Sequence, residues 1–143
     1  TNSATYKLRV EVLQSSSNKW FSAEYATFKI SSEATKYVLS VSGYSGDAGD
    51  ALLYTLADGG ASSSNCRFYS NQMMFSTYDQ DNDLDSVQNW AQTMRGGWWF
   101  NGGVYGCITC SCYNYNFMWK PQHPATYNNL DNARMMIKLQ TTV

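Results

Sequence analysis

A clean alternation of apolar and polar side chains near the start of the chain favours a β-strand. Between residues 6 and 12 every second residue is apolar, and the intervening positions hold two basic residues and one acidic residue. Successive side chains of a strand point to opposite faces, so this pattern predicts a half-buried strand. A polar turn over 15–18 separates it from a second predicted strand, 20–30, and the two are expected to form a hairpin.

Two later segments also predict strands, and loops dominate the rest of the chain. Segment 36–42 is the third predicted strand, and 134–140 is a late one whose odd-numbered apolar residues lie on one side. Segment 86–94 favours a short helix. Gly, Asn, Asp and Ser dominate three long segments, 43–50, 58–65 and 79–86. We therefore expect an α+β, β-rich fold with an antiparallel sheet, long ordered loops and short helices.

The composition bounds the class of protein. A chain of 143 residues suits one domain, 1–143, and its net charge of −1 with no basic patch argues against a nucleic-acid partner. No apolar run approaches the roughly 18 residues of a membrane span, so no membrane insertion is expected. No leader segment is present, so a secreted protein would have lost its signal peptide already. The 11 tyrosines and five tryptophans suit either sugar stacking or an aromatic core.

The four cysteines lack the histidine spacing of a zinc finger and predict disulfides in an oxidising, extracellular compartment. They allow three pairings. Cys110 and Cys112 are separated by one residue and make awkward partners for each other. We expect Cys66 to bridge to the cluster of Cys107, Cys110 and Cys112. A bond to another chain is the alternative.

The segment Asp79–Asp85 places four carboxylates at every second position. It is not an EF-hand, because Leu84 stands where the sixth residue must be Gly and Trp90 where the twelfth must be Glu. Alternating aspartates in a loop supply several of the hard oxygen ligands that Ca²⁺ prefers, and a cation would relieve their mutual repulsion. The sequence therefore predicts calcium as the cofactor. The alternative is a solvated acidic loop with Asx turns.

Three stretches in this order resemble the fibrinogen-like domain of ficolins, tachylectins, angiopoietins, tenascins and fibrinogen. They are 43–50 (GYSGDAGD), 75–83 (FSTYDQDND) and 95–101 (RGGWWFN). The resemblance implies the C-terminal part of the fibrinogen-like fold, truncated at the N-terminus. Trp90 and Gly103 stand where the family usually has a disulfide, so the loop between them must be held differently. The truncated module also resembles molluscan lectins, including slug agglutinins specific for sialic acid.

The resemblance also implies site residues. Calcium would be held by the carboxylates of Asp81 and Asp83 and by the carbonyls of Asp85 and Val87. An N-acetyl group would meet backbone N–H groups in a step that is often a cis peptide in the family, and aromatic walls whose alternative role is core packing. Arg95 would bind a sialic acid carboxylate or else pair with the acidic loop. The expected ligand-binding residues are Arg95, Gly102, Gly103, Val104, Tyr105, Tyr113, Tyr115 and Trp119.

The function that follows is a secreted calcium-binding lectin for N-acetylated sugars, with sialic acid as the expected ligand. We expect a homo-oligomer, because an agglutinin or innate-defence protein gains strength from several sites at once. The alternative is a protein-binding module that recognises a peptide or receptor. An enzyme is not expected, because the lone His123 has no nucleophile motif nearby and the carboxylates cluster for an ion.

Overall fold

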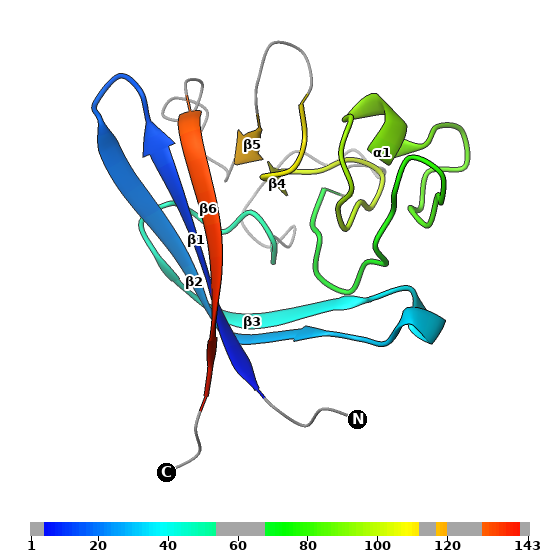
Figure 1. The fold of residues 1–143 in the computed structure, drawn as a ribbon, viewed down its shortest axis with the longest axis horizontal. Helices are drawn as coiled ribbons and strands as arrows, with labels where there is room; N and C mark the ends of the chain where they lie inside the picture. The colour runs from blue at the N-terminus through cyan, green and yellow to red at the C-terminus, as the bar shows by residue number, and fades with distance from the viewer. Residues whose placement is uncertain (1–4, 54–67, 112–116, 120–129, 141–143) are drawn as a thin grey trace, which may run out of the picture.

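A four-stranded antiparallel sheet of order β3-β2-β1-β6 forms one side of the molecule, and loops with a short helix form the other (Figure 1). The computed structural model describes residues 5–53, 68–111, 117–119 and 130–140. The strands of the sheet are β1 (Tyr6–Gln14), β2 (Lys19–Ile30), β3 (Leu39–Gly46) and β6 (Leu130–Leu139). The predicted β-rich class with an antiparallel sheet is confirmed.

Strands β1 and β2 form the hairpin that the alternation predicts. Their register pairs Val12 with Phe21 and Tyr6 with Phe28, with one irregularity between Tyr6 and Leu8. The side chains of Leu8, Val10 and Val12 are at most 1% exposed. Burial of each such side chain contributes about 2 kcal/mol to the free energy of unfolding. The apolar face of β1 therefore packs into the hydrophobic core.

The opposite face of β1 differs from the prediction at Glu11, which is buried although it falls on the polar side of the strand. The Arg9 Nε donates to Glu11 Oε1 at 2.7 Å, and Arg134 of β6 donates to the other carboxylate oxygen. Burial alone would raise the pKa of Glu11, but hydrogen bonds from Arg134 and Arg9 outweigh it and lower that pKa. Trp20 lies beside the Arg134 guanidinium, 4.8 Å from the ring centroid.

Strand β6 is longer than predicted and forms an edge of the sheet. It begins at Leu130, and its pairing of Leu8 with Ile137 and Val10 with Met135 puts the odd-numbered apolar residues on one side, as predicted. Ile137 is nevertheless 57% exposed. Among the described strands β6 is an edge strand, with β1 as its one partner.

Strand β3 begins three residues later than predicted. The short 3₁₀ turn η1 (Glu33–Thr35) ends at Lys36, and both Lys36 and Tyr37 have positive φ, of 58° and 54°. Because a residue in the left-handed region cannot continue a strand, β3 starts only at Leu39.

The loop side packs onto the sheet through aromatic residues. It contains α1 (Trp90–Thr93), inside the segment predicted to be helical, and two strands that the sequence did not predict, β4 (Gly106–Cys107) and β5 (Met118–Trp119). Trp98 Nε1 donates to Ser70 Oγ at 3.0 Å, and Trp99 Nε1 donates to the Tyr37 carbonyl at 2.8 Å. Both indoles are almost fully buried.

No helix in the described ranges is long and apolar enough to cross a membrane.

The glycine-rich segment after β3 ties the loops to the sheet. Asp47 Oδ1 accepts from the Ser22 N–H at 2.8 Å, and Asp50 Oδ1 accepts from the Tyr25 hydroxyl at 2.9 Å. Tyr25 is fully buried, and burial followed by the charge of Asp50 raises the pKa of its phenol far above the ordinary value. These two aspartates explain the physical role of the GDAGD part of the motif 43–50.

Candidate functional site

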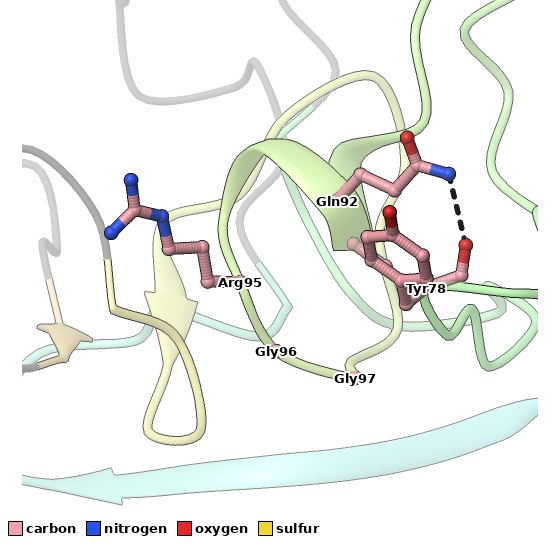
Figure 2. Close-up of a pocket in the computed structure, with 6 residues that line it drawn as sticks. Tyr78, Gln92, Arg95, Gly96 and Gly97 are labelled. Atoms are coloured by element: carbon pink, nitrogen blue, oxygen red, sulfur yellow. Dashed lines mark hydrogen bonds between the residues drawn. The ribbon is translucent and has the colours of Figure 1, made fainter.

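Helix α1 has only four residues, and hydrogen bonds from neighbouring side chains hold it in place. The Asn89 side chain caps it by accepting from the Gln92 N–H at 3.0 Å. The Gln92 side chain in turn donates to the Tyr78 carbonyl at 3.0 Å, as Figure 2 shows. The helix is therefore fastened to the segment that precedes the acidic loop.

The acidic loop fixes the first residue of α1. The Trp90 N–H donates to Asp83 Oδ2 at 2.9 Å, and the Trp90 indole donates to Asp85 Oδ2 at 3.0 Å. The sequence analysis singled out these carboxylates but did not predict that Trp90 joins them. The Trp90 side chain and backbone therefore link the acidic loop to the start of the helix.

The loop carboxylates also accept from their own backbone. Asp81 accepts from the Asp83 N–H at 3.1 Å, Asp83 from the Asp85 N–H at 2.8 Å, and Asp85 from the Val87 N–H at 2.9 Å. These are the Asx turns of the alternative interpretation. Asp79 accepts from the Thr77 hydroxyl at 2.8 Å, which lowers the pKa of that carboxyl.

The acidic loop supplies oxygen atoms that could bind a metal ion. Within the described ranges no three Asp, Glu, His or Cys side chains converge as a ready ligand cluster. Asp81 and Asp83 do lie close together: burial raises the pKa of Asp83, and the negative charge of Asp81 raises it further, against the hydrogen bonds from Trp90 and Asp85. A hard divalent cation would relieve this repulsion, but the described residues do not bring a complete set of ligands together.

A pocket of about 440 Å³ opens beside α1. This volume lies in the range typical of small-ligand sites. Figure 2 shows Tyr78 and Gln92 on one side of α1 and the Arg95 side chain extending away from them. Tyr78 is 73% exposed, so its ring is available at the mouth of the pocket. The lining residues are Tyr78, Ala91, Gln92, Arg95, Gly96 and Gly97.

Arg95 is the predicted ligand-binding residue that does line this pocket. It follows α1 in the left-handed region, with a φ of 54°, and is exposed. The salt bridges among the described residues join Arg9 and Arg134 to glutamates of the sheet, and none involves Arg95. The predicted alternative, in which Arg95 pairs with the acidic loop, is therefore not the arrangement found in the described residues.

The segment expected to supply backbone donors is not part of the lining of this pocket. Gly103 and Val104 are buried, and a Cβ at Gly103, whose φ is 151°, would lie 2.2 Å from the Phe68 ring. Gly102 is half-buried. Tyr105 donates its N–H to the Phe68 carbonyl, and its ring packs on Phe68 with centroids 4.8 Å apart. The structure describes no cis peptide, so the expected family feature is not found here.

The predicted aromatic walls divide into two groups. Trp119 is fully buried, and its indole donates to the Gly49 carbonyl at 3.3 Å, so it has the core-packing role. Tyr113 and Tyr115 lie outside the described residues. The aromatic residue at the pocket is instead Tyr78, which the sequence analysis missed. Its signal was its position inside the motif 75–83, directly before the first aspartate.

The structure narrows the expected pairing of Cys66 with the cysteine cluster. Cys107 and Cys110 form a disulfide with each other, because the loop after β4 brings their Cα atoms within 5.5 Å. A bridge from Cys66 to either of them is therefore excluded. Cys66 and Cys112 lie outside the described residues.

Comparison with known proteins identifies the fold. Residues 1–138 match the family described as fibrinogen beta and gamma chains, C-terminal globular domain, and the chain belongs to this family. It is 32% identical over 118 residues to fibrinogen-like protein A of Apostichopus parvimensis, covering 81% of this chain and 36% of that protein. It is 39% identical over 114 residues to the human fibrinogen alpha chain, covering 80% of this chain and 12% of that one.

Solved structures agree. The fibrinogen-like globe domain of human ANGPTL6 superposes with a TM-score of 0.73 at 25% identity, covering 99% of this chain and 60% of that one. Lamprey fibrin D-dimer in complex with the peptide Gly-His-Arg-Pro-amide gives a TM-score of 0.76 at 24% identity, covering 94% and 45%. The chain thus spans less than two thirds of the length of each of these relatives, from 12% to 60%.

Members of this family share general properties that bear on catalysis, calcium binding and secretion. Fibrinogen-like domains are non-enzymatic binding modules, which agrees with the prediction that the chain is not an enzyme. Domains of this family commonly bind calcium. Fibrinogen and angiopoietin relatives are secreted proteins.

Proposed function

We propose that this chain is a secreted, calcium-dependent lectin that binds N-acetylated sugars, with sialic acid as its ligand, through the pocket beside α1. The supporting observation is that Arg95, which forms no ion pair with the described residues, lines a pocket whose helix is held by the acidic loop. An arginine fork matches a carboxylate in geometry and charge. The exposed ring of Tyr78 offers an apolar face for the acetamide methyl or the sugar ring.

Calcium has an indirect role in this proposal. The cation would be held by Asp81 and Asp83 with the carbonyls of Asp85 and Val87, and it would supply only charge neutralisation and loop order. Because Asp83 and Asp85 bind Trp90, ordering of the loop would be transmitted to the start of α1. The chain's own Tyr78, Gln92 and Arg95 would then contact the sugar.

Several sites acting together complete the proposal. A shallow site that contacts one sugar is weak, so agglutination requires a homo-oligomer that engages several glycans at once. Sedimentation velocity at increasing protein concentration tests this. Sedimentation as a monomer at every concentration, in calcium-containing buffer, would rule out the multivalent form.

A glycan array with and without chelator tests the central proposal. Sialylated and N-acetylated glycans should give signals that a chelator weakens, and free N-acetylneuraminic acid should compete. An array without hits would instead support recognition of a peptide or receptor. This second function is favoured because Gly102–Val104, the expected donors to an acetamide, do not line the pocket, and because the related lamprey fibrin binds a peptide.

A further inference from the structure

The disulfide loop Cys107–Cys110 packs against the backbone that forms one wall of the pocket. The Thr109 hydroxyl donates to the Gly97 carbonyl at 2.6 Å, and the Ser111 N–H donates to the Met94 carbonyl at 2.8 Å. In Figure 2 this loop, pale yellow, follows the arrow of β4 and passes beside the segment labelled Gly96 and Gly97. The two contacts lie at either end of the wall formed by Arg95, Gly96 and Gly97.

The close approach of the two backbones requires glycine at position 96. A Cβ there would lie 2.2 Å from the Thr109 carbonyl oxygen and 3.2 Å from the Cys110 Cα. Real Cβ atoms do not come this close to a backbone oxygen, so the wall and the disulfide loop can touch only because residue 96 has no side chain. Movement of one segment must therefore displace the other.

The disulfide limits how far Thr109 can move. It closes a loop of only two intervening residues, and the sulfur-bearing side chains of Cys107 and Cys110 are at most 1% exposed. The Thr109 hydroxyl also lies 3.5 Å from the Cys107 sulfur, which the disulfide holds in place. The disulfide therefore restrains the position from which the Thr109 hydroxyl donates to the Gly97 carbonyl.

We propose that Thr109, held by the Cys107–Cys110 disulfide, is a positioning residue for the pocket. It fixes the Gly97 carbonyl and, through the segment 94–97, the left-handed backbone from which Arg95 extends. Thr109 does not line the pocket itself and acts through this wall. The effect on ligand affinity rests on the proposed lectin function, whereas the effect on the wall does not.

The test compares Thr109→Val, which removes the donor at nearly constant shape, with Thr109→Ser, which keeps it. Thr93→Val is the matched control, because the Thr93 hydroxyl also contacts a backbone carbonyl, that of Asn89, but lies inside α1. Amide hydrogen exchange at Gly96 reports on the wall without any ligand. Calorimetric titration with methyl N-acetylneuraminate glycoside reports on affinity.

Thr109→Val should speed exchange at Gly96 and raise the Kd about three- to tenfold, the effect of one lost hydrogen bond. Thr109→Ser should restore both, and Thr93→Val should change neither. Unchanged exchange at Gly96 in Thr109→Val would overturn the proposal whether or not the sugar binds. Faster exchange without any sugar binding by the wild-type chain would overturn the lectin function and leave the positioning role standing. Faster exchange with an unchanged Kd would remove Thr109 from control of affinity.

Discussion

The sheet and the loop side of this molecule are ordered by different forces. In the sheet, backbone pairing of β1 with β2 and β6 sets the position of every side chain, and the apolar face of β1 is fully buried. On the loop side, α1 has four residues, too few to persist alone. It is held by individual contacts from Asn89, Asp83 and Asp85. Backbone pairing therefore orders the sheet, whereas the proposed binding site relies on side-chain contacts that can be removed one at a time.

The largest expected effect is a core truncation in the sheet. Leu8→Ala removes a side chain that is 1% exposed, which should lower the free energy of unfolding by about 3 kcal/mol through lost burial and the cavity left behind. Urea denaturation followed by tryptophan fluorescence measures this loss. Ligand affinity of the folded fraction should stay near that of the wild type. A variant that keeps its stability but loses binding would contradict the division between sheet and loops.

Calcium binding should stabilise the loop side of the molecule. A cation bound by Asp81 and Asp83 should raise the free energy of unfolding by about 2.7 kcal/mol at a concentration 100 times its Kd. Thermal denaturation with calcium and with chelator measures the shift. Asp81→Asn should abolish the shift, and Asp79→Asn, which alters the carboxylate bound by Thr77, should retain it. Because burial and Asp81 raise the pKa of Asp83, acid should weaken the calcium effect.

The buried carboxylate on the far face of the sheet should give a smaller, pH-dependent effect. Arg134 and Arg9 lower the pKa of Glu11 against the effect of burial, so its contribution to stability is complete above the unfolded value near pH 4.3 and is lost as the pH falls below it. Both arginines are about half exposed, which limits the loss in Glu11→Gln to about 1 kcal/mol at pH 7.

Urea midpoints measured between pH 3 and pH 7 check this. The wild type should lose stability in acid more steeply than Glu11→Gln, and the two stabilities should converge toward the acidic end of this range. Glu24→Gln is the matched control, because Glu24 also pairs with Arg9 but its side chain is 44% exposed. Parallel pH profiles for the wild type and Glu11→Gln would contradict the role of Glu11.

The same contrast explains what could be predicted from the sequence. Strand periodicity is a local property, so the positions of β1 and β2 and the burial of Leu8, Val10 and Val12 followed from alternation alone. The edge position of β6 did not, because it depends on which strands pair. On the loop side, the motifs located the acidic loop and Arg95, but not Tyr78 or the disulfide, since both depend on turns that bring residues together in space.

The smallest expected effect on stability, combined with a large effect on binding, belongs to Arg95. Its side chain is exposed and forms no ion pair with the described residues, so Arg95→Ala should change the free energy of unfolding by less than about 0.5 kcal/mol. Loss of a charged fork should weaken binding of methyl N-acetylneuraminate glycoside about tenfold or more. Binding of neutral N-acetylglucosamine should change much less. Calorimetric titration of both sugars measures the difference.

Arg95→Lys separates charge from geometry, because lysine keeps the charge but cannot offer two parallel donors. Partial recovery of the sialylated ligand would show that the planar fork contributes beyond its charge. Equal losses for the acidic and the neutral sugar in Arg95→Ala would remove Arg95 from carboxylate recognition, and would show that its left-handed position at the end of α1 matters for the shape of the pocket rather than for its charge.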